Sequence, residues 1–309
     1  MRPRPNPLLV LIAGPTASGK SALALACAER TGGVIVNADS AQVYRDLPLL
    51  SAAPAAADLA RAEHRLYGLL DGSEPSSAAD WAERATTEIA EIHAAGRLPI
   101  LVGGTGLYLR TLLDGIAPVP PIDPDVRQRV RQTPVADNRA ELAALDPEAA
   151  ARLTPADTSR IARALEVVRS TGRPLAAWQR ERTGGIADRV TLRPLILLPP
   201  RAWLYPRCDA RFAAMVEHGA VAEVDALLGR GLDASLPVMR AIGVAEIAAY
   251  LRGETTLADA IAAGQQATRR YAKRQYTWLA HQPPPDWPRF AEPLDAHLEE
   301  AVALLQPKG

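Results

Sequence analysis

The N-terminal third of the chain alternates short apolar runs with amphipathic helical patterns. Mostly apolar runs occur at Leu8–Ala13, Val34–Asn37 and Leu98–Val102. Runs of this kind are typical of strands that are buried on both faces of a parallel sheet. Between them, apolar residues recur at helical spacing over about Lys20–Arg30 and over Ala78–Ala94. This order of elements predicts an α/β fold with a doubly wound parallel sheet.

A proline-rich segment, Pro118–Pro124, interrupts this pattern. The chain beyond it carries helical segments without a convincing strand, so we predict a helical insertion over residues 121–190. A strand-like run, Leu192–Leu198, then returns the chain to the sheet. Residues 1–120 and 191–309 are therefore expected to form one core.

The last third of the chain is helical in pattern from about Pro206 to Gln282. After Pro283 we expect partial order at best. The predicted fold is thus a parallel α/β core with a helical insertion domain and a helical C-terminal region.

Composition indicates an ordinary globular protein, with 48% apolar, 23% charged and 5% aromatic residues. The formal net charge is zero, so no global basic field points to a nucleic acid, although a local basic patch stays compatible with one. Cys27 and Cys208 match no metal-ligand spacing, and no apolar stretch reaches the length of a membrane span. We expect a cytoplasmic monomer without a membrane segment.

A phosphate-binding motif follows the first predicted strand. The segment Gly14-Pro-Thr-Ala-Ser-Gly-Lys-Ser21 fits the pattern G-x-x-x-x-G-K-[ST], between a buried strand and a helix, as a P-loop requires. Backbone N–H groups and the helix N-terminus would surround phosphate oxygens, while Lys20 neutralises charge and Ser21 ligates Mg²⁺. The core is therefore predicted to be P-loop NTPase-like. The predicted diphosphate or triphosphate site comprises Gly14, Pro15, Thr16, Ala17, Ser18, Gly19, Lys20 and Ser21.

A carboxylate is missing from one expected position and present at another. The strand Leu98–Val102 ends in Gly103, where many P-loop ATPases have a metal-binding Asp. Asp39 instead follows the strand Val34–Asn37, at the edge of the sheet where open α/β folds bind ligands. Asp39 could assist the metal, accept a proton from a substrate, or cap a turn.

Several further motifs, taken in order, resemble those of the tRNA dimethylallyltransferase family, and the resemblance extends over almost the whole chain. They are the P-loop segment, Asp39-Ser-Ala-Gln-Val-Tyr44, Ser77-Ala-Ala-Asp80, Val102-Gly-Gly-Thr-Gly-Leu-Tyr108, Arg160 with Arg163-Ala-Leu-Glu166, the segment Arg207–Gly231, and Lys273-Arg-Gln-Tyr-Thr-Trp278.

The resemblance implies transfer of a dimethylallyl group from dimethylallyl diphosphate to N6 of adenosine 37, just 3′ of the tRNA anticodon, with Mg²⁺ as cofactor. It implies that Asp39 is the general base, that Arg211 contacts the diphosphate as its charge develops, and that Thr105 lies with them in the active site. The insertion would grip the anticodon stem-loop. The tRNA contacts that it implies are Asp39, Ser40, Ala41, Gln42, Thr105, Arg127, Ser159, Arg160, Ile161, Ala162, Arg163 and Arg240.

Three alternatives stay open at this point. An ATP-dependent small-molecule kinase also has a P-loop beside an acidic residue, and in such a kinase the P-loop is an ATP-binding motif. A closer alternative prenylates free adenosine nucleotides. A non-catalytic RNA-binding module that keeps a phosphate pocket is disfavoured because Lys20, Ser21 and Asp39 are all present.

Overall fold

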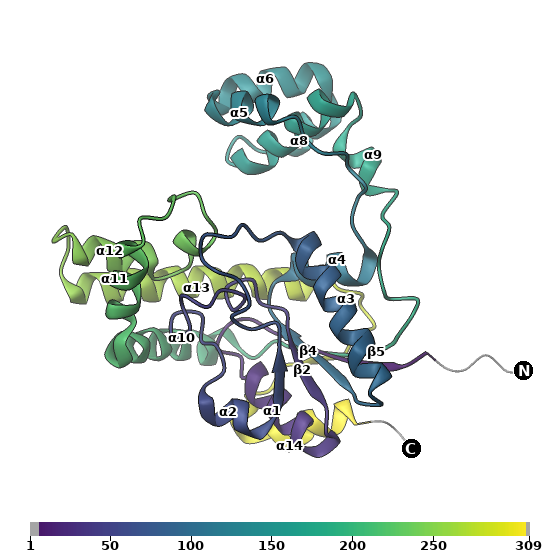
Figure 1. Ribbon diagram of the computed structural model, residues 1–309, viewed down its shortest axis with the longest axis vertical. Helices are drawn as coiled ribbons and strands as arrows, with labels where there is room; N and C mark the ends of the chain where they lie inside the picture. Colours follow the sequence, from purple (N-terminus) through teal and green to yellow (C-terminus); the bar gives the residue numbers. More distant parts are fainter. Residues whose placement is uncertain (1–5, 307–309) are drawn as a thin grey trace, which may run out of the picture. The chain divides into compact units, whose positions relative to one another are not determined.

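The computed structural model describes residues 6–306, which belong to two compact units (Figure 1). The first unit joins Met1–Leu112 with Ala187–Gly309 and contains the sheet. The second unit is Leu113–Ile186 and is helical. Its bounds differ from the predicted 121–190 because Ile116 and Thr183, on the two connecting segments, pair in an antiparallel bridge that closes the unit.

Within residues 6–306 the sheet has six parallel strands in the order β3-β2-β4-β1-β5-β6, which confirms the predicted fold class. The central strand is β1, in which Ile12 lies opposite Val102 on one side and Leu195 on the other. Its residues Leu9 to Ala13 are fully buried, as its continuous apolar run predicted. The strands are β1 Leu8–Ala13, β2 Val34–Asn37, β3 Glu63–Arg65, β4 Pro99–Gly103, β5 Thr191–Leu197 and β6 Arg289–Phe290.

The strands that were predicted are the inner ones. β1 and β2 have the predicted bounds, and β4 and β5 are displaced by one residue. The two edge strands were not predicted, because β3 is a polar Glu-His-Arg segment and β6 has two residues. Edge strands lack the two-sided burial that makes an inner strand visible in a sequence.

Helices cover both faces of the sheet (Figure 1). α1 (Lys20–Thr31) and α14 (Leu294–Leu305) pack their apolar side chains with Val10 and Ile12 on one face. α3 (Ala78–Ala94) lies on the opposite face and begins at Ser77, whose hydroxyl accepts from the N–H of Asp80. The helices predicted near α1 and α3 are confirmed. A short helix, α2 (Ala56–Arg61), was not predicted.

The expectation of partial order after Pro283 is wrong for residues 283–306. This segment adds β6 to the edge of the sheet and ends in α14. Ala301, Val302 and Leu305 of α14 are buried in the core that α1 shares with the sheet. The residues before α14 are rich in proline, and for this reason the helix was not predicted, although its apolar side chains repeat at helical spacing.

The helical pattern predicted for residues 206–282 is confirmed, with short irregular connections. α10 and α13 pack closely, because a Cβ on Gly264 of α13 would meet the ring of Phe212 of α10 at 2.1 Å. No helix in residues 6–306 is long and apolar enough to cross a bilayer. The elements are α10 Arg201–Met215, a π-helical turn Val216–Ala220, α11 Val221–Gly229, a 3₁₀ turn Val238–Arg240, α12 Val244–Leu251 and α13 Leu257–His281.

The second unit has a core of its own, centred on Leu142, Ile161 and Leu165. Asp123 caps α5 by accepting from the N–H of Asp125 at 2.8 Å. The helices are α5 Pro124–Gln132, α6 Val135–Leu145, α7 Pro147–Arg152, α8 Thr158–Thr171 and α9 Leu175–Gln179; α4, Gly106–Asp114, leads into the unit.

Candidate active site

The P-loop occupies the turn between β1 and α1. Gly19, which precedes α1, has a φ of 91°, and Ala17 has a φ of 63°, so the turn uses left-handed backbone at both positions. Gly14 N–H donates to the carbonyl of Gly103 at 3.3 Å, which ties the turn to the end of β4. The Ser18 hydroxyl is buried and has no hydrogen-bond partner within residues 6–306. A buried polar atom of this kind fits a loop that takes an anionic ligand.

Lys20 is buried beside this turn, and its Nζ donates to the carbonyl of Pro15 at 3.4 Å. Burial lowers the pKa of Lys20 to about 8; Asp39 opposes this shift, and Arg211 adds to it. A charged ammonium in this place is therefore costly without a compensating anion. Phosphate oxygens would supply that anion.

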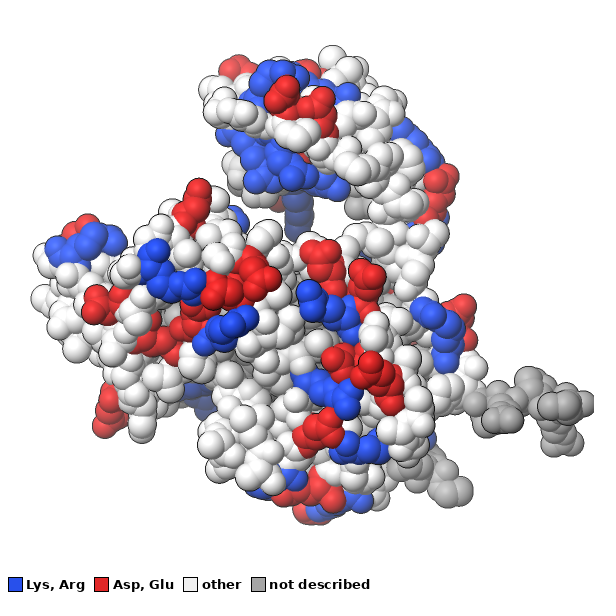
Figure 2. All heavy atoms as spheres, in the orientation of Figure 1, with Lys and Arg blue, Asp and Glu red and all other residues white. Residues whose placement is uncertain are grey.

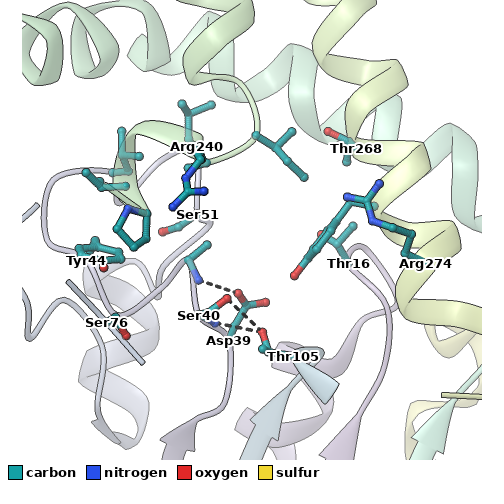
Figure 3. A pocket seen from close by; sticks show the side chains of 18 of the residues that line it. Thr16, Asp39, Ser40, Tyr44, Ser51, Ser76, Thr105, Arg240, Thr268 and Arg274 are labelled. Atoms are coloured by element: carbon teal, nitrogen blue, oxygen red, sulfur yellow. Dashed lines mark hydrogen bonds between the residues drawn. The ribbon is translucent and has the colours of Figure 1, made fainter. Parts of the chain in front are cut away.

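Asp39 lies just beyond the carboxyl end of β2 and is held by its own neighbours. The side chain of Asn37 accepts from Asp39 N–H at 2.8 Å and donates to the carbonyl of Leu66 at 3.0 Å. Asp39 Oδ1 accepts from Ala41 N–H at 3.0 Å, so the turn-capping role is present. No hydrogen bond to Oδ2 occurs within residues 6–306, which leaves that oxygen directed to the cavity that Asp39 lines (Figure 3).

Gly103 explains why β4 carries no acid at its carboxyl end. A Cβ on Gly103 would lie 2.1 Å from the carbonyl oxygen of Ala38, so no side chain fits at the end of β4. The close approach of β4 to the end of β2 therefore excludes an acid at position 103.

One cavity of about 460 Å³ lies at the carboxyl ends of these strands (Figure 3). The loop that follows β2 contributes Asp39, and Arg240 and Arg274 enter from the helical C-terminal region. All residues that line it belong to the first unit. The predicted site residues that line it are Thr16, Asp39, Ser40, Ala41, Thr105, Arg211 and Arg240.

Arg211 reaches the P-loop from α10. Its Nη1 donates to Thr16 Oγ1 at 3.5 Å. Burial lowers the pKa of Arg211, and the Asp39 carboxylate opposes that shift. One turn earlier, Arg207 Nε donates to the carbonyl of Ala17 at 3.3 Å, which braces the left-handed position of the loop. α10 thus places one guanidinium in the cavity and another behind the loop.

Thr105 is fixed against the loop after β2. Its Oγ1 accepts from Ser40 N–H at 3.1 Å, and it donates to Ser40 Oγ at 3.4 Å (Figure 3). Burial raises the pKa of Tyr271, the Asp39 carboxylate raises it further, and Thr105 opposes the shift. The hydroxyls of Thr105 and Ser40 line the cavity with Asp39, and both can contact a ligand that enters it.

The structure adds residues that received no role from the sequence. Gln275, on α13, is buried, and its Oε1 accepts from Thr16 N–H at 2.8 Å. Tyr271 and Arg274 line the cavity from the same helix. The sequence signal for Gln275 was the segment Lys273–Trp278, which resembles the family. That resemblance did not indicate which side chain of the segment contacts the P-loop.

Gln42 and Ser21 lie elsewhere. The amide of Gln42 is buried and donates to the carbonyls of Ser51 and Ala52 at 3.1 and 2.7 Å. Gln42 and Ser21 line a second cavity, of about 450 Å³, together with His64 and Tyr67. The Ser21 side chain is exposed at the start of α1. Their roles in binding tRNA and Mg²⁺ stay predictions.

The other predicted tRNA contacts belong to the helical unit. Arg127, Ser159 and Arg160 are exposed, and Arg163 and Ala162 are partly exposed. Ile161 is fully buried in the core of that unit. Its side chain cannot contact RNA, because the spacing that brings it near the arginines also places it on the inner face of α8.

The donor set suits a magnesium ion that is held chiefly by its substrate. No group of three or more His, Cys, Asp or Glu side chains within residues 6–306 could hold a metal. Mg²⁺ in phosphate-transfer sites keeps several waters and takes few protein ligands besides the phosphate oxygens. The exposed hydroxyl of Ser21 and the orphaned hydroxyl of Ser18 fit such a site.

Together these features define a class. The molecule is an α/β P-loop protein. Thr16 of its P-loop lines one cavity with a carboxylate from the loop after β2, which β4 separates from β1, and with an arginine from a C-terminal helix.

The model of the family described as IPP transferase matches residues 42–282. The tRNA dimethylallyltransferase of Sphingopyxis alaskensis is 62% identical over 297 residues, covering 96% of this chain and 97% of that protein. A full-length tRNA isopentenylpyrophosphate transferase from Bacillus halodurans has a solved structure that is 34% identical, with a TM-score of 0.69 and coverage of 96% and 95%. A eukaryotic dimethylallyltransferase, described as acting on tRNA, aligns at 28% identity with a TM-score of 0.77, covering 88% of this chain and 70% of its own. This chain belongs to the IPP transferase family and is a prenyl-transferring enzyme.

Proposed function

We propose that this protein transfers a dimethylallyl group from dimethylallyl diphosphate to N6 of the adenosine just 3′ of a tRNA anticodon. The observation that carries the proposal is that a P-loop residue, Thr16, and a carboxylate, Asp39, line one cavity. A leaving diphosphate and a nucleophile that loses a proton can thus occupy the same space. The protein would act as a cytoplasmic monomer.

The diphosphate would lie in the P-loop. Lys20 and the backbone N–H groups of the loop would neutralise its charge, and Arg211 would meet the negative charge that grows on it as the C–O bond to the allylic carbon breaks. Ser21 would hold Mg²⁺ with the diphosphate oxygens, and the ion supplies further positive charge at the leaving group when it is bound. Each of these groups stabilises the departing diphosphate more than the intact substrate.

Asp39 would accept the proton. The N6 amine of adenine is a weak nucleophile because its lone pair is delocalised into the ring, so attack on the allylic carbon requires removal of a proton. The N6–C bond forms, the C–O bond to diphosphate breaks, and the N6 proton passes to Asp39. The carboxylate oxygen of Asp39 that makes no hydrogen bond in residues 6–306 is the acceptor that this step needs.

The adenosine would have to leave its stack in the anticodon loop to reach this cavity, as bases do in other base-modifying enzymes. Ser40, Thr105 and Arg240 line the cavity and would contact it through their polar groups. Arg127, Arg160 and Arg163 of the helical unit would contact phosphates, which positions the loop without reading its sequence.

The test is an assay with defined acceptors. The purified protein is incubated with Mg²⁺, dimethylallyl diphosphate and a tRNA that has adenosine at positions 36 and 37, and the digested nucleosides are analysed by mass spectrometry. We expect N6-dimethylallyladenosine, and none from a tRNA with guanosine at position 37. Prenylation of free AMP without modification of tRNA, or phosphate transfer from ATP to a small metabolite, would contradict the proposal.

A further inference from the structure

A buried carboxylate lies at the centre of an arginine cluster in the helical unit. Glu166 of α8 is 1% exposed, whereas the side chains of Arg127, Arg131 and Arg163 around it are 48, 66 and 43% exposed. Figure 2 shows Lys and Arg side chains gathered over α5 and α8 on the visible face of this unit. The carboxylate of Glu166 is therefore buried, whereas the guanidinium groups around it remain accessible to solvent.

The cluster is assembled by helical spacing on two packed helices. Arg127 and Arg131 are four residues apart on α5, and Arg163 precedes Glu166 by three residues on α8, so each pair projects from one face of its helix. Arg131 Nε donates to Glu166 Oε1 at 3.0 Å. Arg127 Nε and Arg163 Nη1 lie 4.0 and 3.9 Å from Oε2.

The arginines repel one another where they meet. Burial lowers the pKa of Arg163; the Glu166 carboxylate opposes this, and Arg127 and Arg131 lower it further. One ionised carboxylate among three guanidinium groups leaves a net positive charge. It also provides the attraction that keeps like charges within a few ångströms of each other.

We propose that Glu166 is a positioning residue for tRNA: it holds Arg127, Arg131 and Arg163 as one surface whose outward N–H groups bind adjacent phosphates of the anticodon stem-loop. The inference rests on the proposed function and adds Arg131 and Glu166 to the residues that serve it. Arginine suits this role because its planar group can donate to a carboxylate on one edge and to a phosphate on another.

The proposal leads to an expectation opposite to that of simple charge counting. Replacing Glu166 by Gln makes the surface more positive, so net charge alone would strengthen RNA binding. Loss of the central carboxylate would instead let the guanidinium groups separate, and the phosphates would lose partners that are already in place. We expect weaker binding from a variant that has gained positive charge.

The experiment compares Glu166→Gln with the unmodified protein in steady-state prenylation and in tRNA binding over a series of salt concentrations. We expect the KM for tRNA to rise about tenfold with kcat within about twofold, and the slope of log K against log salt to fall by about 1 to 2, because fewer phosphates are neutralised. Glu166→Asp, which keeps the charge, should recover part of the affinity.

The matched control is Glu141→Gln. Glu141 lies in the same unit and pairs with Arg169, outside the cluster. It should leave both the KM for tRNA and the salt slope unchanged.

A second variant, Arg131→Met, keeps Glu166 itself and changes a side chain that is largely exposed. It removes the closest partner of Glu166 and should raise the KM for tRNA and lower the salt slope in the same direction.

The outcomes are distinct. An unchanged or lower KM for tRNA in Glu166→Gln and Arg131→Met, with an active unmodified protein, would overturn this inference alone. A loss of thermal stability in Glu166→Gln without a change in salt slope would assign Glu166 a structural role and overturn it as well. Absence of tRNA binding by the unmodified protein would overturn the proposed function and this inference with it.

Discussion

At the scale of single residues, the most informative group is Lys20. Burial lowers the pKa of its ammonium from 10.5 to about 8; the Asp39 carboxylate opposes this shift and Arg211 adds to it. Lys20 therefore loses its proton more readily than an exposed lysine does. An incoming diphosphate would favour the charged form and raise this pKa again.

The prediction concerns the pH dependence of pyrophosphate binding. Lys20 is charged below about pH 8 and loses its proton as the pH rises through that value, so affinity should be constant below pH 8 and fall up to about tenfold for each further pH unit. Calorimetric titration with magnesium pyrophosphate between pH 7 and 9.5 measures it. Lys20→Arg, which stays charged, should give a flatter profile and corrects for titration of the ligand. A profile as steep in Lys20→Arg as in the unmodified protein would contradict the account.

The same residue affects folding with the opposite sign. Because the pKa of Lys20 is lower in the folded chain than its usual 10.5, the unfolded chain binds more protons between pH 8 and 10.5. The contribution of Lys20 to the stability of the protein without added ligand therefore increases as the pH rises through this window.

Residues differ in how far the sequence could predict their part in the site. The P-loop and Asp39 follow from local patterns, because a motif between a strand and a helix fixes its own geometry. Arg211 and Thr105 were expected only through resemblance. The contact of Gln275 with Thr16 joins residues 259 positions apart, and no local pattern encodes it. Likewise the burial of Ile161 depends on how α8 packs.

At the scale of secondary-structure elements, inner strands and their helices could be predicted and peripheral elements could not. The burial of β1 could be predicted from its own apolar sequence. The burial of α14 depends on its packing with α1 and on the position of β6, so the local sequence does not predict it. α14 also supports the site, since a Cβ on Gly19 would meet the side chain of Leu294 at 2.6 Å. α14 therefore lies directly behind the turn between β1 and α1.

The prediction for α14 uses two adjacent leucines. Leu305 is 1% exposed and Leu304 is 51% exposed. Leu305→Ala should lower the free energy of unfolding by about 2 to 4 kcal/mol because it leaves a cavity in the core. Leu304→Ala should change it by less than about 0.5 kcal/mol. Urea denaturation measures both, and equal small effects would mean that the tail does not pack as described.

At the scale of the whole molecule, two units have separate cores. The cavity draws only on the first unit, and the second unit is organised around Leu142, Ile161 and Leu165. The total charge is zero, yet arginines are concentrated on part of the second unit, so overall charge says little about RNA binding. Under the proposed function, the diphosphate would therefore bind in the first unit, and the arginines of the second unit would bind phosphates of the tRNA.

This separation predicts a local response to pyrophosphate. At a ligand concentration of about 100 times Kd, binding should stabilise the first unit by about 2.7 kcal/mol. Hydrogen exchange measured by mass spectrometry should slow in β1, in α1 and in α10 around Arg207 and Arg211, and should not change in α5 to α8. Equal protection of α5 to α8 would show that the two units respond as one.

The central claim is that Asp39 removes the proton while the P-loop holds the diphosphate. Asp39→Asn tests it most directly, because the amide oxygen can still accept from Ala41 N–H and preserve the turn. The measurement is single-turnover transfer to tRNA at pH 7, below the pKa of about 8 of Lys20 in the unmodified protein, together with the Kd for magnesium pyrophosphate. We predict that transfer falls by about 10² to 10⁴, while Kd changes by less than about threefold. Transfer within about tenfold of the unmodified rate would contradict the account.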